Sequence, residues 1–291
     1  MSGFEIDPPT GEIDLEDLLE SRKRKYARKH QAAESRRMIR VKVKMKGPIG
    51  IVHFGDPHVD DDGTDLAALE RHTEIVNKTE GLFAANVGDT TNNWVGRLGR
   101  LYSEQSTTAA EAWALAEWFL TRVKWLYIIG GNHDAWSGAG DPIKWIARQT
   151  GSLYENSGAR LQVVFPNKRE VRINARHTFR GNSMWNPAHA AMRAAQMGCR
   201  DHVLIQGHKH ISGYGLIKDS NSGIVSHCIQ VSSYKIHDRY AQEQGFADHH
   251  ISPCAVTILD PDATTEVGLV QVFHDPEQAA EFLTWLRKKR A

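Results

Sequence analysis

The strongest constraint on this chain is one pattern that occurs five times: a short apolar run followed at once by a small cluster of Asp, Asn, His or Gly. Short apolar runs of this kind are typical of buried strands. In α/β sheets, the loops at the carboxyl ends of the strands converge from distant parts of the sequence. We therefore expect the five clusters to meet at one edge of a sheet. They are Asp56-Pro57-His58, Gly88-Asp89, Gly131-Asn132-His133-Asp134, His177, and Gly207-His208-Lys209-His210.

Strand-like and helix-like segments alternate through the rest of the chain. This alternation predicts an α/β fold in one large domain, which we assign to residues 47–291. The expected strands are 49–54, 82–87, 125–129, 163–165, 170–175, 203–206, 224–231, 255–259 and 269–273. The expected helices are 65–79, with Thr64 as its N-cap, and 107–124, 141–148, 187–197 and 277–289.

Residues 1–46 form a charged N-terminal extension that we expect to be partly helical or disordered. Its first 20 residues are acidic, whereas residues 21–46 contain twelve Lys or Arg and a single acid, Glu34. A basic stretch of this kind is typical of an arm that binds nucleic acid. A solvated helix whose charge is neutralised by the acidic tail explains the same composition. Both interpretations stay open, with nucleic acid as a candidate partner of the segment 21–46.

Composition narrows the class of protein. The formal net charge is +1, so no overall field selects a partner. The three cysteines, Cys199, Cys228 and Cys254, lack a CxxC pair, which argues against a disulfide framework and a thiolate zinc site. No apolar run approaches the roughly 18 residues of a membrane span, and the first residues lack a signal pattern. We expect a cytoplasmic protein with no membrane partner, and no pattern indicates an oligomeric state.

The residue types of the five clusters suit metal ions. The chain has 15 histidines, and neutral imidazole is the commonest metal ligand in proteins. Asp, Asn and His together favour Mn, Fe or Zn over Ca, which prefers all-oxygen sites. Taken singly, each cluster also fits an ordinary loop, and His189, His202 and His227 compete with His177. Only the order of all five is specific. The acidic turn 60–62 is interpreted as solvated, with the binding of extra cations as the alternative.

The order Asp-x-His, Gly-Asp-x-x-Asn, Gly-Asn-His-Asp, His, Gly-His-x-His resembles the signature of the calcineurin-like metallophosphoesterase superfamily, over roughly residues 49–212. The resemblance implies a four-layer αββα sandwich with two central sheets. It also implies two divalent metal ions, with Mn expected and Fe, Zn or Ni as alternatives. The implied ligands are Asp56, His58 and His210 for one ion, Asn132, His177 and His208 for the other, and Asp89 as a bridge. Residues 177–187 are similar to versions in bacteriophage and prophage members.

The same resemblance implies hydrolysis of a phosphate ester by a metal-activated water, with His133 as general acid and Asn92 and Asp134 completing the catalytic set. In the protein-phosphatase branch, the positions of Asn92 and Asn93 hold an Asp that orients the catalytic histidine and an Arg that grips the phosphate. Neither residue is present here, and Gly-Asn-His-Asp resembles the phosphodiesterase and nuclease branches. We therefore expect a phosphodiester substrate, a nucleic acid or nucleotide, rather than a phosphomonoester.

Two other functions stay open from the sequence. One is a phosphomonoesterase that acts on a small molecule or a protein. The other is a nucleic-acid-binding protein that keeps the fold without the chemistry, although nothing else would then require the complete set of donors. Trp94, Trp136 and Trp185 lie near the ends of the clusters. Packing is the simpler interpretation of these side chains, and stacking on a base is the alternative.

Overall fold

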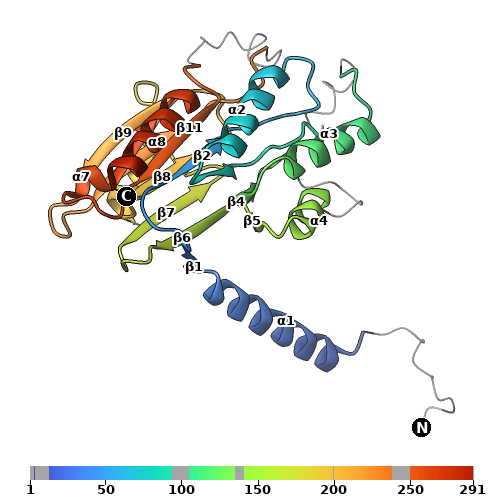
Figure 1. Cartoon of the computed structure of the whole chain (residues 1–291). Coiled ribbons are helices and arrows are strands. Elements are labelled where there is room, and N and C mark those ends of the chain that lie inside the picture. The colour runs from blue at the N-terminus through green and yellow to red at the C-terminus, as the bar shows by residue number, and fades with distance from the viewer. Residues whose placement is uncertain are drawn as a thin grey trace.

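Two six-stranded mixed sheets form the body of the protein (Figure 1). The computed structural model describes residues 3, 13–93, 105–134, 141–198, 200–237 and 250–290. Sheet A has the strand order β1-β6-β7-β8-β10-β9, and sheet B the order β12-β11-β2-β3-β4-β5. The strands of sheet A are β1 (Ile39–Lys42), β6 (Gly158–Val164), β7 (Glu170–Arg176), β8 (Val203–Gln206), β9 (Gly213–Lys218) and β10 (Val225–Gln230). Those of sheet B are β2 (Ile49–Phe54), β3 (Leu82–Asn86), β4 (Trp125–Gly130), β5 (Leu153–Asn156), β11 (Cys254–Leu259) and β12 (Val270–Phe273).

Helices pack on the outer face of sheet B and, over β8, β9 and β10, on the outer face of sheet A. The helices are α1 (Leu15–Ser35), α2 (Leu66–Lys78), α3 (Ala109–Thr121), α4 (Pro142–Gln149), α5 (His189–Met197), α7 (Glu266–Leu269) and α8 (Pro276–Arg290). One apolar core joins sheet B to α2, α3, α4 and α8, and a second lies between the two sheets. A third, smaller core joins sheet A to α5. The expected four-layer α/β sandwich is confirmed.

The strands that precede the polar clusters are buried on both faces. Every residue of β2 and of β8 is buried, which explains why these strands read as continuous apolar runs rather than as alternating ones. β2 pairs in parallel with β3, and β3 with β4. The carboxyl ends of these three strands therefore lie side by side at one edge of sheet B.

Several sequence predictions differ from the structure in detail. The N-cap of α2 is Asp65, whose carboxylate accepts a hydrogen bond from the Ala68 backbone, and not Thr64. The hairpin strand expected at 163–165 begins earlier, at Gly158. β1, β5 and β9 were not predicted. β1 and β9 alternate between exposed and half-buried residues, and β5 has four residues, so none of them presents a clear apolar run.

The N-terminal extension contains both a projecting helix and a strand. α1 extends away from the two sheets, and none of its residues is buried (Figure 1). β1 also lies within residues 1–46, but it pairs in parallel with β6 and forms an edge of sheet A. Among the residues that the structure describes, no helix is long and apolar enough to cross a membrane.

A buried histidine between the sheets makes folding stability sensitive to acid. The His53 ring in β2 lies within hydrogen-bond distance of the Tyr127 hydroxyl (2.6 Å) and the Thr257 hydroxyl (2.9 Å). Burial lowers the pKa of His53 to about 3. The folded protein therefore keeps the ring neutral, whereas the unfolded chain takes up a proton near pH 6.5. This contribution to stability is complete above pH 6.5 and is lost as the pH falls towards 3.

We expect the free energy of unfolding to fall, for this one group, by about 1.4 kcal/mol per pH unit below pH 6.5. Urea titrations between pH 7.5 and pH 5 measure the slope. His53→Gln should flatten it by about one proton relative to the wild type. His30→Gln, which replaces an exposed histidine on α1, is the matched control. Equal slopes in the two variants would contradict the assignment.

Candidate metal centre

The structure brings the five predicted clusters together at the carboxyl ends of strands from both sheets. The Nε2 atom of His177, which follows β7, is the meeting point of one group. It lies 2.9 Å from Asn132 Oδ1, 3.0 Å from His208 Nδ1 and 3.1 Å from Asp89 Oδ2. These partners come from the loops after β4, β8 and β3. The rivals His202 and His227 lie elsewhere and bond to the Arg172 backbone and the Tyr214 hydroxyl.

A second group of donors adjoins the first. His58 Nε2 lies 3.2 Å from His210 Nε2, which in turn lies 3.6 Å from Asp56 Oδ2. Asp56 Oδ1 is 3.7 Å from His177 Nδ1, so the two groups are in contact. All seven predicted metal ligands therefore belong to one continuous cluster.

The spacing of these donors fits divalent cations. Metal–nitrogen distances of about 2.0–2.1 Å place two ligands of one ion roughly 3 Å apart, as the imidazole nitrogens of each group lie here. Donor atoms of Asp89, His177 and His208 all lie within 4.8 Å of one another. One buried oxygen of the other group, Asp56 Oδ1, has no hydrogen-bond partner among the described residues. A bound cation would give this carboxylate oxygen its missing partner.

The backbone at the cluster is strained. Of eight described non-glycine residues with positive φ, six lie in the clusters or next to them. Side chains other than glycine rarely adopt this conformation, and such residues persist only where the surroundings hold them. The concentration of this strain at one place marks it as a candidate functional site. The six residues are Asp56, His58, Asp89, Asn93, His208 and His210.

Glycines beside the ligands allow two loops to approach the buried carboxylates. A Cβ atom on Gly131 would lie 2.0 Å from Asp89 Oδ1, and one on Gly207 would lie 2.4 Å from Asp56 Oδ1. No side chain fits at these distances, so these two glycines are required for the cluster to close.

Burial sets the protonation of the cluster histidines. It holds the pKa of His58 well below its ordinary value and lowers the pKa of His208 to about 4, so both rings are neutral and their lone pairs are available. For His177, burial lowers the pKa, but the neighbouring Asp89 carboxylate outweighs burial and raises it to about 10. The Asp89–His177 pair therefore holds a proton that a bound cation would displace, because metal ligands must be deprotonated.

His133 and Asn92 are in contact, but through the backbone. The Nδ1 atom of His133 hydrogen-bonds to the main-chain carbonyl of Asn92, and its backbone N–H donates to Asp89 Oδ1 at 2.9 Å. The side-chain amide of Asn92 instead donates to Asp61 Oδ2 at 2.7 Å. The His133 ring is thus oriented by the main-chain carbonyl of Asn92. The Asn92 side chain, which stands at the position of the phosphatase aspartate, does not contact the ring through a described hydrogen bond. Asn93 donates to the His133 carbonyl at 2.8 Å.

Asp134 lies beside the cluster and braces it. Its carboxylate is buried and accepts hydrogen bonds from the backbones of Thr90 (2.9 Å) and Gly131 (2.7 Å). It thereby joins the loop that carries Asp89 to the loop that carries Asn132. Burial, together with the charge of Asp89, raises the pKa of Asp134 to about 7. Both oxygens are thus engaged by the backbone, which makes Asp134 a positioning residue.

The interpretation of the acidic turn as solvated is wrong for Asp60 and Asp61, although Asp62 is exposed. Asp60 is only 2% exposed and accepts hydrogen bonds from the Asn92 backbone (2.7 Å) and the Gln105 amide (2.9 Å). Asp61 accepts from the Asn92 side chain and forms an ion pair with Lys235 (3.0 Å). Sequence reasoning missed these residues. The run of three acids was the only local signal, and nothing near Lys235 indicates its partner.

The exposure of Trp185 excludes the packing interpretation for this tryptophan. Its side chain is 91% exposed, and the neighbouring Met184 is 92% exposed, in the loop between β7 and α5. The same loop is tied to the cluster, because Lys209 donates to the Gly181 carbonyl at 3.1 Å. Trp94 and Trp136 lie outside the described residues.

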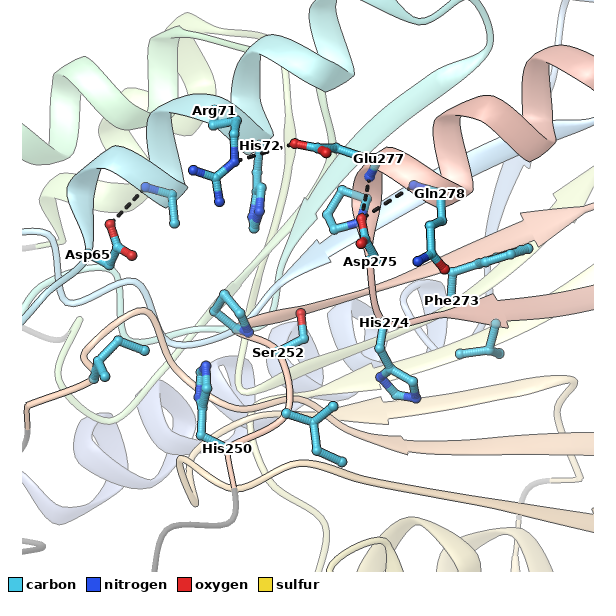
Figure 2. A pocket seen from close by; sticks show the side chains of 16 residues that line it. Asp65, Arg71, His72, His250, Ser252, Phe273, His274, Asp275, Glu277 and Gln278 are labelled. Carbon is cyan, nitrogen blue, oxygen red and sulfur yellow. Dashed lines mark hydrogen bonds and ion pairs between the residues drawn. The ribbon is translucent and has the colours of Figure 1, made fainter.

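A cavity of about 680 Å³ lies at a different place and shares no residue with the cluster (Figure 2). It opens between α2, the start of α8 and the loop around His250. Its charged groups are of both signs, and Arg71 and Glu277 in its wall form an ion pair at 3.5 Å. Asp65 and Asp275 already cap the two helices that reach it. This mixture indicates no particular ligand.

No protein-family model matches the chain, and no curated protein matches it. Solved structures resemble it at low identity. The NAD nucleotidase NadN of Haemophilus influenzae is 10% identical with a TM-score of 0.39, over 79% of this chain and 50% of NadN. The Pseudomonas putida nuclease MPE is 14% identical, with a TM-score of 0.34 over 77% and 84%. The calcineurin-like phosphoesterase YfkN of Bacillus subtilis is 10% identical, with a TM-score of 0.33 over 84% and 98%.

The chain therefore spans half the length of NadN and most of the other two proteins. At this level of similarity, function has to be inferred from the residues of the cluster themselves.

Replacing Gly207 by alanine tests the geometry of the centre. The new methyl group would displace the Asp56 carboxylate, so we expect Mn²⁺ affinity to fall about 10- to 100-fold, as for other changes that misplace a ligand. Isothermal titration calorimetry of the purified protein measures this affinity. Gly268→Ala in α7, whose nearest neighbour would be a threonine side chain at 3.2 Å, is the control. If both folded variants bind Mn²⁺ equally well, Asp56 is not a ligand.

Proposed function

We propose that this protein is a metal-dependent phosphoesterase, with a phosphodiester as the preferred substrate. The observation that supports this function is the convergence of seven oxygen and nitrogen donors from five separate loops. Asp56, His58 and His210 would hold one cation, and Asn132, His177 and His208 the other. Asp89, which contacts His177 and the His133 backbone, would be shared between them. Mn is the proposed metal, with Fe, Zn or Ni as alternatives.

Bound divalent cations at such a site supply Lewis-acid stabilisation of the phosphoryl oxygens and lower the pKa of water from 15.7 to about 7. The protein contributes the pre-formed donor set and excludes alternative geometries, because its strained loops hold the donors in place. The neutral rings of His58 and His208 are ready to bind without losing a proton.

His133 is the proposed general acid. The Asn92 carbonyl can only accept a hydrogen bond, so His133 Nδ1 carries a proton that it donates to this carbonyl. Nε2 is then the ring nitrogen that would exchange a proton with the substrate. When the ring carries a second proton, Nε2 can donate it to the oxygen of the departing alcohol. The ring lies close to the donors, with 5.2 Å between the centroids of His133 and His58.

Asn92 and Asn93, in the loop after β3, favour a diester over a monoester. A phosphomonoester carries up to two negative charges on its phosphate, and a cationic side chain at these two positions would help to bind it. Asn92 and Asn93 occupy that position, and both side chains are neutral and bonded within the protein. A phosphodiester carries one negative charge and needs less compensation.

Hydrolysis of bis-p-nitrophenyl phosphate in Mn²⁺ tests the function. We expect His133→Asn to lower kcat by about 10²- to 10⁴-fold, the usual contribution of a general acid, while Mn²⁺ affinity stays close to that of the wild type. His189→Asn, on α5 and outside the cluster, is the control and should keep full activity. Inactivity with each of Mn²⁺, Fe²⁺, Zn²⁺ and Ni²⁺ would refute the proposed enzymatic function. A preference for p-nitrophenyl phosphate would identify a monoesterase.

Two adjacent acids provide a matched test of how His133 is positioned. Asp61 holds the Asn92 amide, whereas the exposed Asp62 contacts Ser106 (2.6 Å). We expect Asp61→Ala to lower kcat about tenfold with little change in KM, because the Asn92 carbonyl that orients His133 loses its support. Asp62→Ala should have no such effect. Asp61→Asn, which keeps an acceptor, should recover part of kcat. Equal kcat values for both alanine variants would contradict this role.

A further inference from the structure

Half of the outer face of sheet A has no helix packed on it. The side chains of α5 pack on β8, β9 and β10, with Ala191 and Ala195 in the same core as Leu204 and Cys228. Among the described residues, no helix makes a comparable contact with β1, β6 or β7. The side chains on an uncovered sheet face need hydrogen-bond partners or counter-charges, which either water or a binding partner can supply.

The charged residues on this uncovered face are mainly basic. Leu161, Val163 and Ile173 belong to the core between the sheets, so their neighbours along each strand point outward. Arg160 and Arg172 both contact one buried carboxylate, Asp201, at 2.7 Å and 3.2 Å, which leaves a net positive charge. The acid on the face is Glu170, which accepts from Gln162. The charged and polar outward residues that are exposed or half-buried are Arg40 and Lys42 on β1, Arg160 and Gln162 on β6, and Glu170, Arg172 and Arg176 on β7. Gly158, Val164 and Asn174 share the same register, and Val164 and Asn174 are buried.

Strand β1 and the segment that follows it carry four cations at alternate positions of the sequence. Arg40, Lys42, Lys44 and Lys46 are exposed, and the residues between them are half-buried. Arg40 and Lys42 are alternate residues of the extended strand β1, so they are about 6.6 Å apart, close to twice the rise of about 3.4 Å per phosphate along one strand of a duplex. Among the described residues, no ion pair neutralises any of these four side chains.

Helix α1 extends the basic surface beyond the sheet. None of its residues is buried, and it projects from the body next to β1 (Figure 1). Of its six Lys and Arg residues, Lys23 pairs with Glu20 (2.8 Å), and the other five form no ion pair with a described residue. These six are Arg22, Lys23, Arg24, Lys25, Arg28 and Lys29.

The basic face leads to the candidate metal centre. On β7 the outward register runs from Arg172 to Arg176 and continues past the strand to the exposed Arg180, while His177 between them turns into the cluster. The base of α1 is anchored nearby, because Arg36 pairs with Glu155 (3.1 Å) in β5. Two residues further on, the Ser157 carbonyl accepts a hydrogen bond from the His177 backbone.

We propose that the outer face of β1, β6 and β7, together with α1, binds the phosphate backbone of a nucleic acid and guides it to the metal centre. The spacing of Arg40 and Lys42 on β1 matches a polymer with evenly spaced phosphates. The exposed Trp185 lies on the loop where this face reaches the centre and offers a surface on which a base can stack. This inference deepens the proposed function and rests on it for the identity of the substrate, but not for the binding itself.

Fluorescence anisotropy with labelled single-stranded DNA, duplex DNA and RNA tests the surface. The full chain is used in EDTA, so that binding does not depend on the metal centre. We expect Arg40→Ser/Lys42→Ser/Lys44→Ser to weaken binding at least about tenfold. The slope of log K against log salt should become shallower by about 2–3, because about 0.9 counterions are released per phosphate contact.

The control removes the same charge elsewhere. Lys78→Ser/Lys124→Ser/Lys288→Ser changes three exposed lysines on or beside the helices that cover sheet B. If the two triple variants lose the same affinity for nucleic acid, the loss is explained by net charge alone, and the proposal is overturned. So would the failure of the wild type to bind any nucleic acid at low salt. Tighter capture by phosphatidylserine vesicles than by nucleic acid would assign the surface to membranes and overturn it too.

Hydrolysis separates this proposal from the function on which it rests. The sheet-face variant should hydrolyse bis-p-nitrophenyl phosphate like the wild type but show a raised KM for a labelled oligonucleotide. Hydrolysis of the small diester without nucleic-acid binding would overturn the surface and leave the phosphoesterase intact. Binding without any hydrolysis would refute the phosphoesterase and retain the surface.

Discussion

The buried carboxylate of Asp89 is the constraint on which the candidate centre depends. It is 2% exposed, and a charge in that position is tolerated only when it is paired and hydrogen-bonded. Its two oxygens face the His133 backbone and the His177 ring, which belong to different loops and different sheets. Gly131 must remain without a side chain for these contacts to form. One acid thus sets the relative positions of sheet A and sheet B at this edge.

Holding such a site together requires bracing, because its backbone is strained. The braces are polar side chains that bond to the backbone of a neighbouring loop. Asp134 ties Thr90 to Gly131, Asp60 holds the Asn92 N–H, and the Ser233 hydroxyl donates to the Asp56 carbonyl at 2.7 Å. Each brace connects segments that are distant in sequence. The strained residues therefore stay in place without any contribution from the substrate, which is the arrangement expected of a pre-organised site.

How much the sequence could predict follows from how local each signal is. The strand β2 and the cluster after it were predictable, because a wholly buried strand is a continuous apolar run and its end is marked by Asp56 and His58. The edge strands β1 and β9 were not, because half-buried edges lack that run. The Lys235–Asp61 ion pair and the Asn92 carbonyl that orients His133 depend on loop conformations and contacts far apart in the chain. The amino-acid composition and the local sequence pattern do not predict such contacts.

The cations on β1 have a second physical explanation, and the distribution of charge weighs against it. Exposed lysines on an edge strand prevent another strand from pairing with it, and Arg40 and Lys42 on β1 suit that purpose. Protection of an edge would need basic residues on β1 alone. The charge continues over the face of β7 to Arg176 and along α1, neither of which has an open strand edge. Since Arg160 and Arg172 share the carboxylate of Asp201, the face is stable in water without a partner, and a polyanion could bind and leave without unfolding it.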